Sequence, residues 1–138
     1  MKIKILNNGI KIPTKAYQGD AGFDVYAPER IVLFPQTHKQ IKLGLMIEIN
    51  QNEVCVMSER SGMAIKNGTT SIGNIIDSGY RGEISIILYN TKTEKVIYEK
   101  DEKIGQMLII QLGNQNLEIV DELSQSERQD KAHYSSGK

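Results

Sequence analysis

The sequence predicts an all-β protein, a jelly-roll-like antiparallel barrel with one short helix. Apolar and polar residues alternate with a period of two in many short runs, and Gly, Asn and Pro separate these runs. Strand and helix patterns do not alternate, which argues against a parallel sheet. The 138 residues fit one domain that buries a core without disulfides or metal ions.

The clearest predicted strand runs from Gln40 to Asn50. Its apolar face consists of Ile41, Leu43, Leu45, Ile47 and Ile49, so it is expected to be half-buried. Shorter runs of this kind predict further strands, in chain order, at Lys2–Leu6, Ile31–Phe34, Glu53–Ser58, Ile84–Tyr89, Lys95–Tyr98, Ile104–Leu112 and Leu117–Val120. The pattern of a helix, and a short one, appears at Gly62–Lys66.

The character of the sequence changes after Leu123. Residues 124–131 are polar and show no periodicity, which is typical of a mobile terminal segment. We therefore expect a β-domain at residues 1–123 and a flexible C-terminal arm at residues 124–138. No internal repeat or second domain is expected.

The composition excludes several kinds of metal site. Cys55 is the single cysteine, so the chain forms no internal disulfide and no thiolate zinc cluster. The two histidines, His38 and His133, lie far apart in the sequence, which argues against a histidine metal site. A metal, if the protein uses one, is expected to be a hard cation that an anionic ligand brings with it.

The charge and hydropathy of the chain limit the kinds of partner that we expect. The formal net charge is zero, whereas a nucleic-acid surface needs an excess of Lys and Arg, so no nucleic-acid partner is expected. Met1–Lys4 leads directly into alternating residues without an apolar signal region, and no run is long enough to cross a membrane. We therefore expect a cytoplasmic protein with no membrane partner.

The segment Gly73–Asn90 joins an acidic residue, an aromatic ring and three glycines to an alternating strand. Ser78-Gly79 and Arg81-Gly82 supply turn residues between two apolar runs, so the pattern predicts a β-hairpin. Asp77 and Tyr80 are then fixed at a rigid bend. Taken alone, an Asp beside a turn more often caps the backbone than takes part in chemistry.

Arg60-Ser61-Gly62 lies where a strand gives way to the predicted helix. Ser61 is expected to cap that helix, whose first N–H groups then favour an anion. The Arg60 guanidinium adds a planar set of donors suited to phosphate oxygens. The alternative is an ordinary helix cap with a surface arginine.

Three other segments place polar residues at strand or terminal positions. Asp24 lies between small and apolar residues in Ala21–Ala27, and Gln106 is near the start of Lys103–Leu108. Ser135-Ser136-Gly137 offers hydroxyl and backbone donors that suit a phosphate. Taken separately, the first segment is equally consistent with a turn that enters a strand, the second with an outward-facing strand residue, and the third with a frayed terminus.

Together and in order, the five segments resemble the five motifs of the homotrimeric dUTPases, the deoxyuridine triphosphate nucleotidohydrolases. The motifs correspond to Ala21–Ala27, Arg60–Gly62, Gly73–Asn90, Lys103–Leu108 and Arg128–Gly137. The resemblance spans nearly the whole chain, and the combination is far more specific than any one motif. It implies the jelly-roll-like fold, a homotrimer, and three active sites at subunit interfaces, each built from more than one chain.

The resemblance also implies a reaction, in which dUTP and water give dUMP and pyrophosphate with Mg²⁺. Water attacks the α-phosphorus in line, and the reaction keeps uracil out of DNA and supplies dUMP for thymidylate synthesis. Asp77 matches the carboxylate that orients and deprotonates this water, and Tyr80 matches the tyrosine that packs on deoxyribose. The contacts to uracil match main-chain groups around Asn74, Ile75, Ile76 and Asp77 and near Ser85.

The same resemblance implies where the triphosphate and the metal bind. Mg²⁺ is implied to bridge the phosphates, and Asp24 to act at most through a metal-bound water molecule or by orienting a neighbour. The residues that match the phosphate ligands are Arg60, Ser61, Gly62, Gln106, Arg128, Ser135 and Ser136.

The chain departs from the family pattern at several positions. The last motif of the family is usually glycine-rich with a phenylalanine that stacks on uracil, and at ungapped spacing His133 occupies that position. A shift of one residue offers Tyr134 instead, so both are candidates. Glu59 replaces a usual proline, Asp101 a common glycine, and Asn74 stands where glycine is frequent. We expect these changes to alter turns and not chemistry, although the Asn74 side chain is placed to add a contact to the base.

Two rival functions are weighed against dUTP hydrolysis. dCTP deaminase shares the fold and a related hairpin but needs a glutamate base on the following strand, where this chain has Ile87. An apolar side chain cannot transfer protons, so deamination is rejected. A trimeric binding protein that has lost catalysis is favoured only by the altered last motif. Against it, Arg60, Asp77, Tyr80 and Gln106 all stand where the resemblance requires them.

Overall fold

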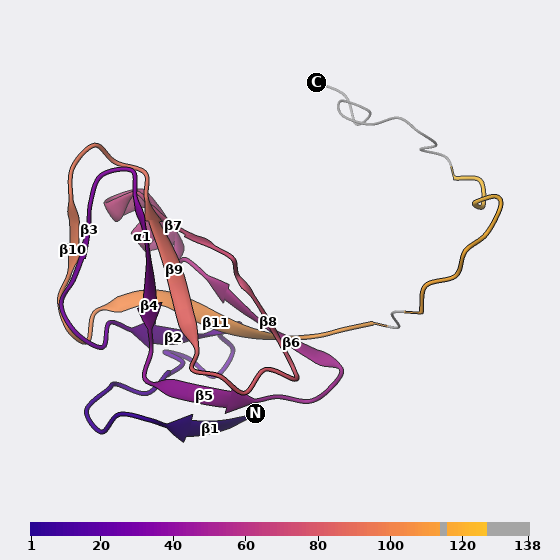
Figure 1. Ribbon diagram of the computed structural model, residues 1–138, viewed down its shortest axis with the longest axis horizontal. Helices are drawn as coiled ribbons and strands as arrows, with labels where there is room; N and C mark the ends of the chain where they lie inside the picture. Colours follow the sequence, from indigo (N-terminus) through magenta and orange to yellow (C-terminus); the bar gives the residue numbers. More distant parts are fainter. Residues whose placement is uncertain (114–115, 127–138) are drawn as a thin grey trace.

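The computed structural model describes residues 1–113 and 116–126 (Figure 1). Its elements are β1 (Lys2–Ile5), β2 (Gly22–Tyr26), β3 (Ile31–Leu33), β4 (His38–Lys42), β5 (Leu45–Glu48), β6 (Glu53–Ser58), α1 (Ser61–Asn67), β7 (Thr69–Ile72), β8 (Ile75–Asp77), β9 (Ser85–Asn90), β10 (Val96–Tyr98) and β11 (Lys103–Gln111). All pairings between these strands are antiparallel. The predicted all-β antiparallel class with one short helix is therefore confirmed for the described residues.

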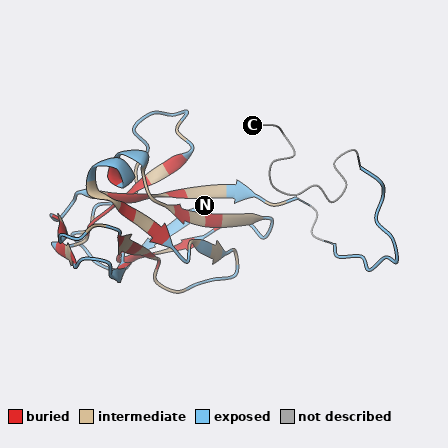
Figure 2. Cartoon of the chain, turned by 90° about the horizontal axis from the view of Figure 1, so that it is seen from above, coloured by how far each residue is buried: buried red, intermediate tan, exposed pale blue. Residues whose placement is uncertain are grey.

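The described strands form two larger and two smaller sheets. The larger sheets have the strand orders β2-β11-β6-β8 and β4-β9-β7, and the smaller ones pair β1 with β5 and β3 with β10. Side chains from both larger sheets share one hydrophobic core, and Figure 2 shows the buried residues gathered in the body of the strands. In the part of the chain that the structure covers, no helix is long and apolar enough to cross a membrane.

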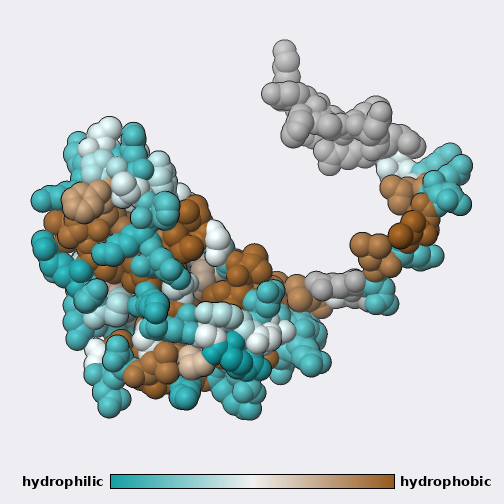
Figure 3. Space-filling view, in the orientation of Figure 1, coloured by the Kyte–Doolittle hydropathy of each residue, from teal (hydrophilic) through white to brown (hydrophobic). Residues whose placement is uncertain are grey.

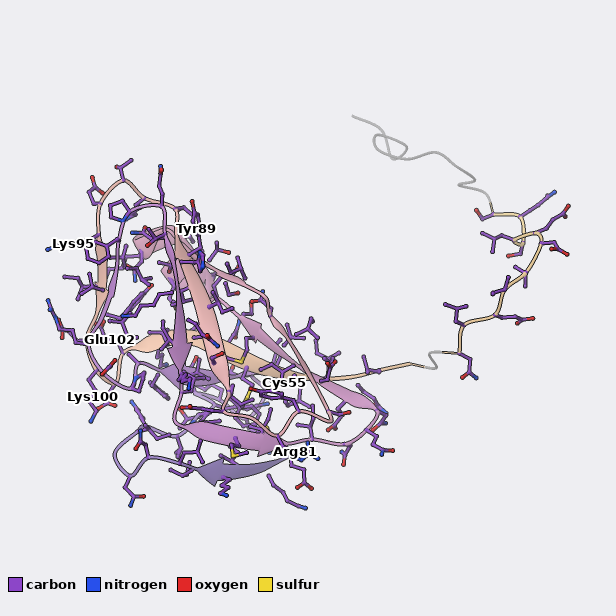
Figure 4. The ribbon with its side chains drawn as sticks, in the orientation of Figure 1. Cys55, Arg81, Tyr89, Lys95, Lys100 and Glu102 are labelled. Carbon is purple, nitrogen blue, oxygen red and sulfur yellow. The ribbon has the colours of Figure 1, made fainter. Side chains whose placement is uncertain are left out.

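Cys55 lies in the centre of this core (Figure 4). It stands on β6 between Ile109 of β11 and Ile76 of β8, and its exposed fraction is 0%. Burial raises the pKa of the Cys55 thiol to about 12, because the thiolate loses its hydration in the apolar interior. The thiol is therefore protonated and inert at neutral pH.

The predicted strand from Gln40 to Asn50 is divided into β4 and β5 in the structure. The five apolar residues of its inner face are all buried, as predicted. The chain turns at Gly44, which has a φ of 71°. A side chain there would place its Cβ atom 2.9 Å from Cγ2 of Ile10, so the turn requires glycine. The predicted alternation of buried and exposed residues is correct. The prediction of one continuous strand is wrong because it did not take the glycine into account.

The predicted hairpin at Gly73–Asn90 is also wrong in its pairing. β8 pairs with β6, whereas β9 pairs with β4 and β7, so the two strands belong to different sheets. The turn between them exists, since Tyr80 N donates to Asp77 O at 3.0 Å. Apart from this turn, the strands separate and leave space between them. That space becomes a cavity in the structure.

Two other segments differ from the sequence prediction. β7 was missed, because its Thr and Ser residues give no clear alternation of apolar and polar side chains. Leu117–Val120 forms no strand, and residues 116–126 as a whole contain neither helix nor strand. Leu117, Ile119 and Leu123 are strongly exposed, and Figure 3 shows apolar side chains along this segment. A strand needs a neighbour for its backbone groups, and none of the described strands pairs with residues 117–120.

The side chain of Asn90 joins the end of β3 to the loop after β9 in the interior, and its exposed fraction is 0%. Nδ2 donates to the carbonyl oxygens of Leu33, Phe34 and Glu94, and Oδ1 accepts from Lys92 N at 2.9 Å. We expect Asn90→Leu to lower the free energy of unfolding by about 3 kcal/mol or more, because it leaves several buried backbone groups unpaired. Urea unfolding followed by circular dichroism measures this loss.

The matched control is Asn8→Leu, since Asn8 is an exposed asparagine in a turn. This control is expected to change the free energy of unfolding by less than about 0.5 kcal/mol. Equal effects of the two substitutions would contradict a supporting role for the Asn90 side chain.

Candidate active site

The turn after β8 presents the carboxylate of Asp77 at the protein surface. Within the described residues, no hydrogen bond or ion pair reaches this carboxylate, and the main-chain oxygen alone closes the turn. Asp77 is thus not the side-chain cap that a lone Asp at a turn would suggest. Arg81 holds the turn from outside, since its Nη1 donates to Ser78 O at 2.7 Å and to Tyr80 O at 3.0 Å (Figure 4).

The ring of Tyr80 lies directly against the backbone at Gly82. A Cβ atom added to Gly82 would lie 2.2 Å from the tyrosine hydroxyl oxygen and 2.4 Å from Cζ. The hydroxyl donates to Glu83 O at 3.3 Å, and about half of the Tyr80 side chain remains exposed. Gly82 is therefore required for the position of the ring, which leaves one aromatic face toward solvent.

The space between β8 and β9 is a cavity of about 210 Å³, which we call the Asp77 cavity. Its lining residues are Gly73, Ile75, Ile76, Asp77, Tyr80, Glu83, Ser85 and Ile87. β8 is the edge strand of its sheet, so the backbone groups on its outer side have no partner strand. The cavity therefore combines unpaired main-chain donors and acceptors with an aromatic ring and a free carboxylate.

Asn74 lies next to this cavity but is not among its lining residues. Its main-chain oxygen accepts from Met57 N at 2.8 Å, which ties it to β6. Its side-chain Oδ1 is buried and has no hydrogen-bond partner in the described residues. The expected additional contact from this side chain to a base is thus not supported by its position.

A second cavity, of about 480 Å³, lies beside the start of α1, and we call it the Arg60 cavity. Its lining residues are Ala16, Asp20, Ala21, Gly22, Asp24, Arg60, Ser61, Gly62 and Gln106. The structure therefore brings together the predicted residues of three separate segments. Ser61 is not the helix cap as predicted, because Arg60 occupies the cap position and makes no side-chain cap hydrogen bond.

Asp24 is largely buried in the Arg60 cavity and lies between two cations. Its Oδ1 is 2.9 Å from Arg60 Nε and its Oδ2 is 2.8 Å from Lys103 Nζ. Sequence reasoning missed Lys103 as a site residue. The pairing of β11 with β2 places Lys103 opposite Tyr26. Tyr26 is two residues from Asp24, so the side chains of both point to the same face of the sheet as Lys103. A pairing between such distant segments leaves no local signal.

Gln106 is held on two sides. It lies opposite Asp24 of β2 and Ser58 of β6, and its Nε2 donates to Glu59 O at 3.2 Å. A Cβ atom on Gly22 would lie 3.0 Å from Gln106 Oε1, so glycine leaves the room that this amide fills. The amide is therefore oriented at the wall of the Arg60 cavity.

The two cavities are distinct on one chain. Asp77 of β8 pairs with Val54 along one edge of β6, and Gln106 of β11 pairs with Ser58 along the other edge. With about 3.3 Å per residue and about 4.8 Å between strands, the Cα atoms of Asp77 and Gln106 are about 16 Å apart. The free carboxylate and the cationic group therefore do not face each other within one subunit.

The donors in the described residues do not form a metal cage. No group of three or more His, Cys, Asp or Glu residues that suits a metal occurs in residues 1–113 and 116–126. Asp24 already faces two cations. The predicted residues Arg128, His133, Tyr134, Ser135 and Ser136 lie outside the described residues.

Known proteins resemble this chain in sequence and in fold. The family model for dUTPase matches residues 8–137. The chain belongs to the dUTPase family. Among curated dUTPase relatives, the deoxyuridine 5'-triphosphate nucleotidohydrolase of Clostridium tetani is 40% identical over 140 residues, covering 100% of this chain and 97% of the relative. The enzyme of that name from Clostridioides difficile is 42% identical and covers 93% and 91% of the two chains.

Solved dUTPase structures show the same fold. Staphylococcus bacteriophage 80alpha dUTPase with dUpNHpp has a TM-score of 0.86 at 27% identity, covering 99% of this chain and 97% of that one. A substituted dUTPase from phage phi11 of S. aureus, with a structural Mg(II) ion, has a TM-score of 0.83 at 21% identity and covers 90% and 98%. These structures confirm the fold predicted from the sequence.

Proposed function

We propose that this chain is a dUTP diphosphatase, which hydrolyses dUTP to dUMP and pyrophosphate. The observation that carries the proposal is the free Asp77 carboxylate at the rim of a cavity lined by unpaired edge-strand backbone. Water held by this carboxylate attacks the α-phosphorus in line, and Asp77 accepts its proton. Membership of the dUTPase family and the named function of its relatives support this reaction.

Uracil binds in the Asp77 cavity through main-chain groups. The outer edge of β8, at Ile75 and Ile76, and the chain near Asn74 and Ser85 supply the donors and acceptors. Cytosine reverses one donor and one acceptor, which leaves buried groups unpaired and lowers kcat/KM by about 10⁴. The Tyr80 ring, held against Gly82, packs on the deoxyribose and leaves no space for a ribose 2′-hydroxyl.

The triphosphate binds in the Arg60 cavity. Arg60, Ser61, Gly62 and Gln106 supply guanidinium, hydroxyl, backbone and amide donors there. The arm closes over the substrate with Arg128, Ser135 and Ser136, and either His133 or Tyr134 stacks on the base.

The described donors do not form a dedicated Mg²⁺ site, since Asp24 is paired with Arg60 and Lys103. The cation would therefore enter with the triphosphate, and Asp24 would reach it only through a water molecule. When bound, the cation neutralises the charge of the phosphate oxygens. Asp24 itself fixes Arg60 and Lys103 beside the phosphates.

Each site is assembled from more than one subunit of a homotrimer. A general base must lie within hydrogen-bond distance of its water, about 3 Å, and that water must reach the α-phosphorus. The Asp77 and Arg60 cavities of one chain are separated, and the Arg60 cavity of a neighbouring subunit supplies the phosphate ligands instead. The trimer acts in the cytoplasm without nucleic-acid or membrane partners, where it keeps uracil out of DNA and supplies dUMP for thymidylate synthesis.

The proposal is tested by incubating the purified protein with Mg²⁺ and dUTP. Release of pyrophosphate and dUMP in equal amounts is the expected result. Incubation with dCTP is expected to give no ammonia, because Ile87, which lines the Asp77 cavity, transfers no proton. Binding of dUTP without turnover would instead support a binding protein, and ammonia release would support a deaminase.

A further inference from the structure

Glu59 lies between β6 and α1 and makes several hydrogen bonds to residues of neighbouring strands. Its Oε2 accepts from Ser71 N at 3.1 Å and from Ser71 Oγ at 2.5 Å, and its N–H donates to Ser71 Oγ at 3.2 Å. We call this pair the Glu59–Ser71 clasp. The main-chain oxygen of Glu59 accepts from Gln106 Nε2 at 3.2 Å and from Ser58 Oγ at 3.1 Å. One residue thus joins β6, β7 and β11.

The start of α1 has little other support. Arg60 takes the cap position in an extended conformation, with φ −96° and ψ 141°, and makes no side-chain cap hydrogen bond. The first turn of this seven-residue helix contains no acidic residue. The hydrogen bonds of the preceding residue, Glu59, therefore fix the direction in which the chain enters Arg60.

Glu59 also determines the orientation of Gln106. The Gln106 amide lies between the main-chain oxygen of Glu59 and the backbone of Gly22. A shift of the Glu59 carbonyl removes the acceptor for Nε2 and allows the amide to rotate. Glu59 itself is absent from the lining of the Arg60 cavity, so it acts on that cavity through its neighbours.

We propose that Glu59 is a positioning residue whose clasp with Ser71 holds Arg60 and Gln106 in the geometry that binds the phosphates. This inference rests on the proposed function of the Arg60 cavity. Ser71 is buried, with an exposed fraction of 7%, so its donors find no ready substitute in water when the carboxylate is removed. Glu59, which lies beside the proposed phosphate ligands, therefore has a role in substrate binding. From the sequence, its replacement of the family's usual proline suggested only a change of turn.

The charge of Glu59 strengthens the clasp. The hydrogen bond from the Ser71 side chain lowers the pKa of the Glu59 carboxyl, more than desolvation raises it. The residue is therefore ionised at neutral pH, and hydrogen bonds to a charged acceptor are stronger than those to a neutral amide. Glu59→Gln keeps the size and an acceptor oxygen, so it is expected to retain part of the clasp.

The test uses two inhibitors that occupy different cavities. Pyrophosphate reports on the Arg60 cavity, and deoxyuridine reports on the Asp77 cavity. For Glu59→Ala, the inhibition constant of pyrophosphate is expected to rise about 10-fold, with a similar rise in KM for dUTP. The inhibition constant of deoxyuridine is expected to stay the same. Ser71→Ala should act in the same direction, and Glu59→Gln should lie between Glu59→Ala and the unchanged protein.

Glu53→Ala is the matched control. Glu53 begins β6, the strand that Glu59 directly follows, and its carboxylate also accepts a backbone N–H, from Asn50 at 2.8 Å, at the far end of that strand. It is expected to leave both inhibition constants unchanged. This control separates a loss at the Arg60 cavity from a general weakening of β6.

Each of the following outcomes would overturn the inference. Pyrophosphate inhibition that is unchanged in both Glu59→Gln and Ser71→Ala would exclude the clasp, even if Glu59→Ala failed to fold. An equal loss for both inhibitors would indicate general loosening. Loss of pyrophosphate inhibition in Arg60→Ala but not in the clasp variants would leave the proposed function intact and refute the positioning role. Unchanged inhibition in Arg60→Ala would instead refute the phosphate site itself.

Discussion

Asp77→Asn is expected to lower kcat for dUTP hydrolysis by about 10²–10⁴-fold, which is the usual contribution of a general base. The amide has nearly the same size as the carboxylate but accepts no proton from the attacking water. The turn hydrogen bond from Tyr80 N to Asp77 O does not involve the carboxylate, and asparagine keeps the shape of the cavity lining at this position. The dissociation constant of the analogue dUpNHpp should therefore change by less than about 3-fold.

Asp101→Asn is the control for this substitution. Asp101 has a φ of 66°, in the left-handed region where Asn is readily accepted, and it lies in the turn before β11. It should leave both kcat and analogue binding unchanged. Loss of analogue binding in Asp77→Asn together with a lower melting temperature would mean that Asp77 supports the turn and does not act as the base.

Mixing two inactive variants is expected to restore activity. Arg60→Ala removes a phosphate ligand, and Asp77→Asn removes the base, so each variant alone should be nearly inactive. When the chains are unfolded together, mixed in equal amounts and refolded, the proposed homotrimer is expected to contain both kinds of chain. Some interfaces then combine an intact Arg60 cavity with an intact Asp77 cavity. For a site built from two chains, about a quarter of the sites are complete, and the mixture should recover about that fraction of activity.

A chain that carries both substitutions controls for the mixing procedure. Refolded with either single variant, the double variant should restore no activity, because no interface then holds both intact cavities. An inactive mixture of the two single variants, with trimers present by sedimentation, would contradict the shared site. The Asp77 and Arg60 cavities would then have to act within one chain.

Much of the fold follows from local patterns in the sequence. The alternation at residues 40–50 identified the buried face correctly, since all five of its apolar residues are buried. Its division falls at Gly44, which has a φ of 71°, so the glycine was a local signal that the prediction did not use. The separation of β8 from β9 depends instead on the competing partners β6, β4 and β7. Local pattern predicts strands well, but strand pairing is decided by the rest of the molecule.

For the candidate site, the sequence identified some residues and missed others. Asp77, Tyr80, Arg60 and Gln106 were identified through the family resemblance, and the structure places them in two cavities. Lys103 and Glu59 were not identified as site residues, because their contacts join strands that are distant in sequence. Ser61 was predicted to be the helix cap from its residue type alone. The helix begins at Ser61 itself, so the cap position falls on Arg60.

The burial of Cys55 makes the chain convenient for spectroscopic labelling. Its thiol is enclosed by the core, and the sequence contains no second cysteine. A cysteine introduced at an exposed position, such as Ser126→Cys near the start of the arm, would therefore be the one reactive thiol of the native protein. A maleimide fluorophore would attach there without prior removal of the natural cysteine. The label would then report in real time whether its surroundings at residue 126 change during turnover.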